Sequence, residues 1–125
     1  MDKLKIKGTE NTPDINFDIS TGEFWIEGNS FFNNSGEFFI DIIKWVNSQK
    51  VKPATKIKLH VSLEYFDSSS KKGVVELIKT LIEWCKKTQL EIFWHYNTDD
   101  QDALDIGKEF SKFFEMDFNF ISSIG

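Results

Sequence analysis

The spacing of hydrophobic residues changes near the middle of the chain, and this change predicts a strand followed directly by a helix. In residues 56–66 apolar side chains occupy every second position, which is the pattern of a half-buried strand. From Gly73 they recur at every third or fourth position, which predicts a helix with one buried stripe. The junction falls on residues 67–70, one aspartate followed by three serines, and we expect the helix to begin there.

The same two periods place the other elements of the fold. Alternating segments bounded by turn residues predict strands at residues 4–7, 15–19, 23–27, 90–96 and 117–121. Helical spacing predicts helices at residues 35–46 and 99–115, and residues 28–34 are expected to form a loop. The turn Ser20-Thr21-Gly22 joins the second and third strands into a hairpin. An opening hairpin followed by alternating helices and strands predicts an α/β (α+β) fold, a mixed β-sheet with helices mainly on one face.

The polar junction is suited to capping the helix and also to carrying a modification. Asp and Ser side chains accept hydrogen bonds from backbone N–H groups that have no partner inside the helix. A phosphate on a serine there would add about −1.5 to −2 charges, which a helix N-terminus tolerates. A partner docked on the same surface would have to bury that charge, so the modification would eject the partner and leave the fold intact. The alternative is that Asp67 and the serines only cap the helix.

Size and composition fit one compact domain that spans residues 1–125. The chain has a single cysteine, so it has no internal disulfide. Cys85 lies on the apolar stripe of its helix, where a buried thiol is expected. No apolar run has the length of a signal peptide core or a membrane span. We therefore expect a cytoplasmic protein with no membrane partner.

The charged residues oppose nucleic acid as a partner. The net charge is −5, whereas nucleic acid binding depends mainly on cationic groups that displace counterions from phosphates. All 15 basic residues are lysines, so the chain lacks the bidentate arginine fork used to recognise phosphate and guanine. We predict no binding to nucleic acid.

Several aspartates near the last helix resemble a cation site, but their spacing does not fit one. Hard cations such as Mg²⁺ and Ca²⁺ prefer oxygen ligands of this kind. Counting a calcium loop from Asp99 places Leu104 where the turn glycine belongs. Capping and the helix dipole already explain acidic residues in a first helical turn. We therefore predict no metal site among Asp99, Asp100, Asp102 and Asp105.

No sequence motif indicates catalysis. His60 and His95 each lie within a predicted strand, and neither has a nucleophile or a second ligand near it in the sequence. We interpret both as structural or surface histidines. Glycine-rich phosphate loops and His-Glu-x-x-His motifs are absent from the sequence. An enzyme that uses the acids at 99–105 with Ser68 or His95 is a remote alternative, and we predict that the protein is not an enzyme.

Short motifs distributed along the chain carry a family resemblance. They are Thr12-Pro13 with Phe17-Asp18, the segment from Gly22 to Gly28 with Ser30, Phe38-Phe39 with Trp45, Tyr65-Phe66-Asp67-Ser68-Ser69-Ser70-Lys71, Trp94-His95-Tyr96 with Asp99-Asp100-Gln101-Asp102, and Gly107 with Glu109-Phe110. In order and spacing they resemble the SiaC family of bacterial regulatory phosphoproteins, small STAS-like domains similar to anti-sigma factor antagonists. The pair Asp67-Ser68 stands where the family usually has Asn-Thr.

The resemblance implies a non-enzymatic switch. It implies that a Ser/Thr protein kinase phosphorylates Ser68, with Ser69 and Ser70 as alternates, and that a PPM-type phosphatase removes the phosphate. The unmodified form is expected to dock to a diguanylate cyclase, which links the switch to cyclic-di-GMP. An anti-sigma factor in a partner-switching pathway is the alternative partner. The partner surface is expected to comprise Asp67, Ser68, Ser69, Lys71, Lys72, Asp99 and Asp100.

Overall fold

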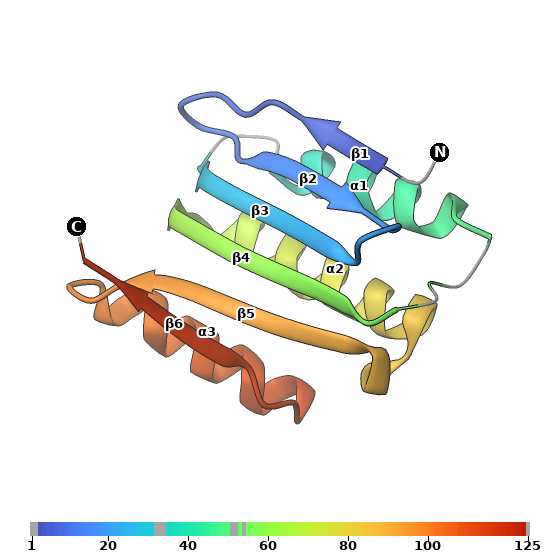
Figure 1. The fold of residues 1–125 in the computed structure, drawn as a ribbon. Coiled ribbons are helices and arrows are strands. Elements are labelled where there is room, and N and C mark those ends of the chain that lie inside the picture. Colours follow the sequence, from blue (N-terminus) through green and yellow to red (C-terminus); the bar gives the residue numbers. More distant parts are fainter. Residues whose placement is uncertain (1–2, 32–34, 51–52, 54, 125) are drawn as a thin grey trace.

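Strands and helices alternate along most of the chain. The structure is a computed structural model that describes residues 3–31, 35–50, 53 and 55–124. In chain order its elements are β1 (Lys3–Ile6), β2 (Asp14–Asp18), β3 (Glu23–Ser30), α1 (Ser35–Ser48), β4 (Ile57–Phe66), α2 (Ser68–Cys85), the short 3₁₀ helix η1 (Lys87–Gln89), β5 (Leu90–Asn97), α3 (Gln101–Phe114) and β6 (Asn119–Ser123). The strands form one sheet whose spatial order follows the sequence from β1 to β6 (Figure 1).

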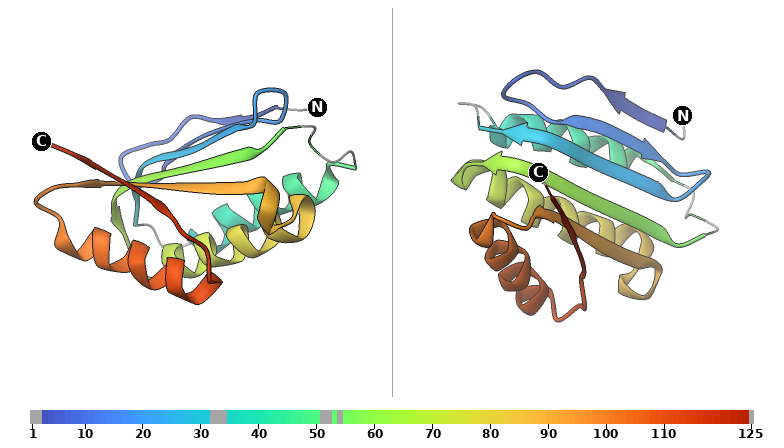
Figure 2. Two further views of the ribbon diagram at one scale, coloured as in Figure 1. Left: turned by 60° about the horizontal axis from the view of Figure 1, so that its bottom comes forward. Right: turned by 60° about the vertical axis from the view of Figure 1, so that its left-hand side comes forward.

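The sheet is mixed, as the sequence predicted. β1, β2 and β3 are antiparallel neighbours, whereas β3, β4, β5 and β6 run parallel to one another. One α-helix connects each pair of parallel neighbours, and all three α-helices lie on the same face of the sheet (Figure 2). Right-handed crossovers between successive strands require this arrangement, because each helix then returns over the same face. The opposite face of the sheet is left without a covering layer of helices among the described residues.

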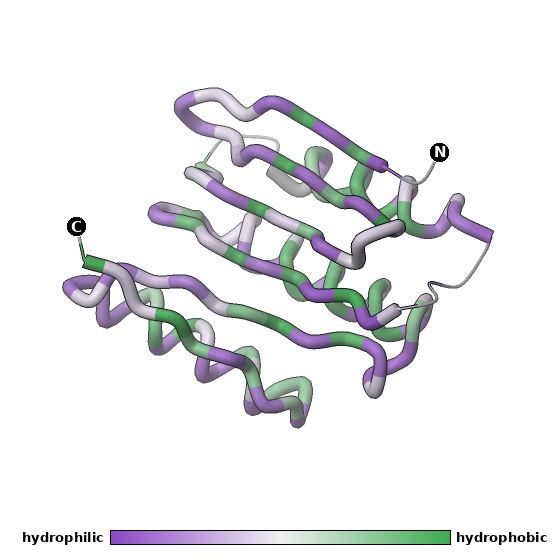
Figure 3. The backbone as a smooth tube through the Cα atoms, in the orientation of Figure 1, coloured by the Kyte–Doolittle hydropathy of each residue, from purple (hydrophilic) through white to green (hydrophobic). Residues whose placement is uncertain are grey.

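The core lies between the sheet and the helices. Hydrophobic and hydrophilic residues alternate along the strands, so each strand turns one set of side chains toward the helices (Figure 3). Phe39 of α1, Leu77 of α2 and Trp94 of β5 are among the fully or almost fully buried side chains. Cys85 is buried, as predicted. Among the described helices, none is both long and apolar enough to cross a membrane.

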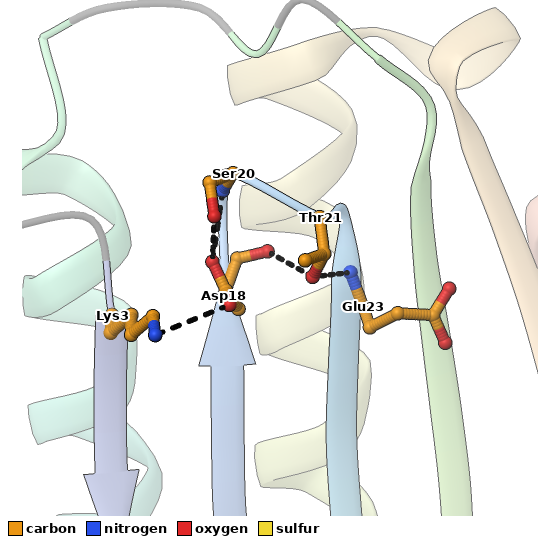
Figure 4. Close-up of polar contacts among 5 residues, drawn as sticks. All are labelled: Lys3, Asp18, Ser20, Thr21 and Glu23. Atoms are coloured by element: carbon orange, nitrogen blue, oxygen red, sulfur yellow. Dashed lines mark hydrogen bonds and ion pairs between the residues drawn. The ribbon is translucent and has the colours of Figure 1, made fainter.

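The β2–β3 hairpin turn is held by side-chain hydrogen bonds (Figure 4). The Asp18 carboxylate accepts from the Ser20 hydroxyl at 2.6 Å and from the Ser20 amide at 3.0 Å. The bond from the Ser20 hydroxyl is the main reason that the pKa of Asp18 lies below its ordinary value. Thr21 Oγ1 accepts from the amide of Glu23 at 3.3 Å, which fixes the residue that opens β3.

The predicted end of β3 differs from the structure. β3 continues to Ser30, through the first part of the segment 28–34 that was expected to be a loop. Gly28 has a φ of 124°, and the pairing with β4 shifts register between Gly28 and Ser30, which marks a bulge. The bulge breaks the alternation that reveals a strand in the sequence. A predicted cap by the Ser35 side chain lies outside the described parts of the structure.

Buried hydrogen bonds tie the start of α2 to the end of β3. We call this set of contacts between Ser30, Asp67 and Ser70 the latch. The Ser30 carbonyl accepts from the Asp67 amide at 3.0 Å and from the Ser70 hydroxyl at 2.8 Å. Since the single Ser70 hydroxyl proton is used there, the hydroxyl of Ser30 donates to Ser70 Oγ. Both serine side chains are fully buried. The Asp67 carboxylate is the N-cap and accepts from the Ser70 amide at 2.8 Å.

We predict that Gly73→Ala destabilises the protein although alanine favours helices. A Cβ at Gly73 would lie 2.4 Å from Cδ2 and 2.9 Å from Cβ of Phe39, so the whole buried side chain on α1 would have to move. Overpacking of this kind costs about 1–3 kcal/mol. Urea denaturation of Gly73→Ala in the native and Phe39→Ala backgrounds measures the effect. An equal loss of stability in both backgrounds would contradict this contact as its cause.

We predict that Ser70→Ala lowers the free energy of unfolding by about 1–3 kcal/mol, because it leaves the buried Ser30 hydroxyl without its acceptor. Ser69→Ala is the matched control. Ser69 directly precedes Ser70 and its side chain is exposed, so the expected change in the free energy of unfolding is within about 0.5 kcal/mol. The readout is the urea midpoint at constant m-value. Equal midpoints for the two variants would show that the latch contributes nothing to stability.

Candidate functional site

The predicted site residues gather at one edge of the sheet. Because β4 and β5 are parallel neighbours, the loops after their carboxyl ends meet at this edge. One loop leads into α2 through Asp67, and the other leads into α3 through Asp99 and Asp100. The junction predicted at residues 67–70 is therefore the N-terminus of α2, with Asp67 as its N-cap and Ser68 as its first residue.

The latch separates the three candidate serines by accessibility. Ser68 and Ser69 are exposed in the first turn of α2, where an enzyme in solution can reach their hydroxyls. Ser70 is fully buried, and its hydroxyl is bonded to Ser30. A kinase could reach Ser70 only after the first turn of the helix had opened. Accessibility therefore makes Ser70 the weakest of the three predicted phosphorylation sites.

The start of α2 is a favourable place for an added anion. The first helical turn contains no acidic residue, and its dipole places partial positive charge at Ser68. Residues three and four positions apart lie on the same side of a helix, so Lys71 and Lys72 follow Ser68 on its side of α2. Lys72 is exposed and Lys71 is half-buried. The start of α2 thus offers backbone donors and two lysines on the side of the helix that carries Ser68.

Two exposed aromatic side chains adjoin the N-cap. Phe31 and Tyr65 are 44% and 67% exposed, and their rings meet edge to face with centroids 6.3 Å apart. Together with Phe66 and Asp67 they line a shallow pocket of about 410 Å³. Large exposed aromatic side chains beside a polar site are the kind of anchor that protein partners bury. Sequence reasoning missed this pair, because Tyr65 shares its strand with core residues and Phe31 lay in a presumed loop.

A second hollow lies between α1 and α2, next to Ser69. Its volume is about 470 Å³, and its walls are mainly apolar. The lining residues are Phe39, Ile40, Ile43, Ser69, Lys72, Gly73 and Glu76. Ile40 is half exposed there. Two of the predicted partner-binding residues, Ser69 and Lys72, therefore border an apolar groove that the sequence pattern did not reveal.

Of the predicted acidic residues at the start of α3, Asp100 serves as the helix cap. Asp100 is the N-cap and accepts from the Ala103 amide at 3.0 Å. Asp99 donates its amide to the side-chain oxygen of Asn97 at 2.9 Å. Both aspartates also line an open pocket of about 660 Å³ with Tyr65 and His95. Within the residues that the structure describes, no group of three or more His, Cys, Asp or Glu side chains is placed to hold a metal ion.

The structure does not assemble a catalytic pair from Ser68 and His95. The Nε2 atom of His95 lies 3.0 Å from Nδ1 of His60, in a hydrogen bond between neighbouring strands. Ser68 lines none of the three hollows, although Tyr65 connects two of them. Burial, with the charge of nearby His60 as a smaller cause, places the pKa of His95 below its ordinary value. The histidine contact was missed because it joins residues far apart in the sequence.

Both the sequence and the fold match a known family. The sequence profile of the SiaC family regulatory phosphoproteins matches residues 6–123. SiaC of Pseudomonas aeruginosa is 27% identical, and the superposition covers 100% of both chains with a TM-score of 0.80. The crystal structure of diguanylate cyclase SiaD in complex with its activator SiaC, from the same organism, also matches. There the identity is 27% and the TM-score 0.79, with 98% of this chain and 99% of that chain covered.

The relatives agree along nearly the full chain. An uncharacterized protein of Pseudomonas aeruginosa strain UCBPP-PA14 is 29% identical over 111 residues, which is 88% of both proteins. This chain matches the SiaC profile over residues 6–123. It has the mixed sheet, the helices on one face and the exposed start of α2 described above. The resemblance found in the sequence is confirmed, and the chain belongs to the SiaC family of regulatory phosphoproteins.

Proposed function

We propose that the protein is a docking regulator whose unphosphorylated form binds and activates a diguanylate cyclase, and that phosphorylation of Ser68 ends the contact. The observation that carries the proposal is the exposure of Ser68 on a helix start that the latch holds in place. A change at this hydroxyl alters the surface without disturbing the core. The crystallised complex of SiaC with diguanylate cyclase SiaD supports this class of partner.

Charge explains how one phosphate would release the partner. Phosphorylation would move the net charge from −5 to about −7 and concentrate the new charge at one point. Lys71 and Lys72 are within one helical turn of Ser68, so the phosphate would pair with them in place of acidic groups on the partner. Desolvating the phosphate beneath a docked protein would add a further cost.

The neighbouring surface supplies affinity for the unmodified form. The pair of Phe31 and Tyr65 lies against Asp67, one residue before the phosphorylated position. Burial of two such rings beneath a partner contributes most where water is fully excluded. The groove beside Ser69 adds a second apolar surface near the helix start. We propose that the partner covers both hollows together with the hydroxyl of Ser68.

We assign no catalytic step to the protein itself. A Ser/Thr protein kinase and a PPM-type phosphatase would add and remove the phosphate, and all three proteins would meet in the cytoplasm. Of the acids at 99–105 that the enzyme alternative would use, Asp100 accepts from the Ala103 amide, which is a capping role. His95 is bonded to His60. These contacts give Asp100 and His95 structural roles.

We predict that a protein kinase encoded next to this gene, supplied with Mg²⁺ and ATP, adds one phosphate at Ser68. Mass spectrometric mapping of the adduct tests the site, with Ser69→Ala as the matched control because Ser69 is also exposed. Calorimetric titration with the organism's diguanylate cyclase should then show at least a tenfold loss of affinity. Ser68→Ala should fold, bind the cyclase and accept no phosphate. Phosphate on another residue, or unchanged binding after modification at Ser68, would refute the switch.

We predict that Tyr65→Ala weakens binding of the unmodified protein to the cyclase at least tenfold while leaving its thermal midpoint nearly unchanged. The ring is 67% exposed, so its removal costs little in the free protein. Phe113→Ala is the control, since Phe113 is 62% exposed on α3, away from Asp67. Equal binding by both variants would show that the partner does not cover the aromatic pair.

A further inference from the structure

The two histidines of the chain meet on the face of the sheet opposite the helices. They are the only histidines in the sequence, and 35 residues separate them. His60 lies on β4 and His95 on β5, and both belong to the set of strand residues that alternates with the core set. Nδ1 of His60 and Nε2 of His95 are 3.0 Å apart. At this distance the two nitrogens share one hydrogen, so one of them donates and the other accepts.

Glu23 decides which of the two nitrogens donates. Oε1 of Glu23 lies 3.0 Å from Nε2 of His60, and a carboxylate only accepts, so this nitrogen carries a proton and donates it. In the neutral His60 ring Nδ1 is then the acceptor, and Nε2 of His95 is the donor. The amide of Glu23 is itself held by Thr21 in the hairpin turn (Figure 4). Hydrogen bonds therefore run in one direction, from His95 through His60 to Glu23.

The two histidine rings differ in how firmly their neighbours hold them. Trp25 stacks on His60 at 3.9 Å with an interplanar angle of 2°, and Phe93 stacks at 4.7 Å with an angle of 15°. The side chain of His60 is only 11% exposed. The ring of His95 is instead tilted by 31° from Trp25 at 5.2 Å, and it lines the open pocket beside the start of α3. If the rings repel each other, His95 is the one that can move.

The hydrogen-bonded chain has room for one added proton but not for two. A first proton from solvent, taken up by the other ring nitrogen of His95, leaves the bond from Nε2 to His60 in place. Its charge is shared by the two rings and is balanced by Glu23, 3.0 Å from His60. A second proton would put hydrogens on both facing nitrogens. Two like charges would then face each other with no acceptor between them.

We propose that Glu23, His60 and His95 form a proton-responsive contact, which survives one added proton and opens when a second one binds. On opening, His95 moves away from β4 toward the pocket of about 660 Å³ that it lines. Three acidic side chains line the same pocket and would attract the charged ring, namely Glu64, Asp99 and Asp100. Acidification would therefore change the surface beside the start of α3.

The charged groups around the pair come from three strands. By strand register and alternation, the other charged side chains on this face near the pair are Glu27 of β3, Lys58 and Glu64 of β4, and Glu91 of β5. The neighbouring strand β6 contains no charged residue. Burial is the main reason that the pKa of His95 lies below its ordinary value of 6.5, and the charge of His60 lowers it further.

The lowered pKa of His95 makes stability depend on pH. The unfolded chain binds a proton at His95 near pH 6.5, whereas the folded protein binds it only at lower pH. Because the unfolded state then holds more protons, stability falls as the pH drops through 6.5 toward the folded pKa of His95. His95→Gln removes this contribution, and its side-chain amide can still donate to His60.

The test is ¹⁵N NMR of the histidine rings in the purified protein, titrated from about pH 8 to about pH 5. At the upper end we expect a proton on Nε2 of both rings and a scalar coupling between His60 Nδ1 and His95 Nε2 across the hydrogen bond. The coupling should persist when the first proton binds and disappear with the second. In His60→Gln the pKa of His95 should rise. On acidification the urea midpoint should fall further in the native protein than in His95→Gln.

Several outcomes would overturn the assignment. They are the absence of the coupling at the upper end, a proton on Nδ1 of neutral His60, a coupling that survives double protonation, an unchanged pKa of His95 in His60→Gln, and equal loss of urea midpoint in the native protein and His95→Gln. The coupling and the proton positions are measured on the native protein, so they decide the matter even if a variant does not fold. None of these measurements uses a kinase or a cyclase. The result is therefore independent of the proposed function at Ser68.

Discussion

Two buried hydroxyls, on Ser30 and Ser70, fix the start of α2, and the proposed switch depends on this contact. A helix N-terminus leaves backbone donors unpaired and frays easily. Here the amide of the N-cap, Asp67, and the hydroxyl of Ser70 both donate to the carbonyl of Ser30 at the end of β3. The backbone that carries the Ser68 hydroxyl is therefore held by hydrogen bonds on both sides. A phosphate at this position would change the charge of the surface without having to order or melt a segment.

The sheet places the core, the loops at its carboxyl edge and a cluster of stacked rings in different regions of the molecule. All three α-helices cover one face and bury the apolar residues of the strands. The carboxyl edge of β4 and β5 carries the helix starts, the exposed aromatic pair and the caps. The opposite face carries the stacked Trp25, His60 and Phe93. The two surfaces meet at the open pocket that Tyr65, His95 and Asp99 line.

The sequence predicted what depends on local periodicity and missed what depends on register. The change from period two to helical period located the start of α2 at Ser68, and Asp67 was recognised as a cap. His60 was predicted to lie within a strand, and it lies in β4. Its contact with His95 depends on how β4 and β5 align, which no single segment encodes. The end of β3 was missed for a similar reason, because the bulge at Gly28 interrupts the alternation.

The aspartate at position 67 bears directly on the proposed switch, because the family usually has asparagine there. An acidic neighbour would weaken the contrast between the two states if its charge faced the partner. In this structure the Asp67 carboxylate accepts from the Ser70 amide, so its charge is directed at the helix backbone. An aspartate and an asparagine are equally good N-caps, since both offer a side-chain oxygen. The exchange therefore preserves the helix start, and Lys71 and Lys72 remain available to the phosphate on Ser68.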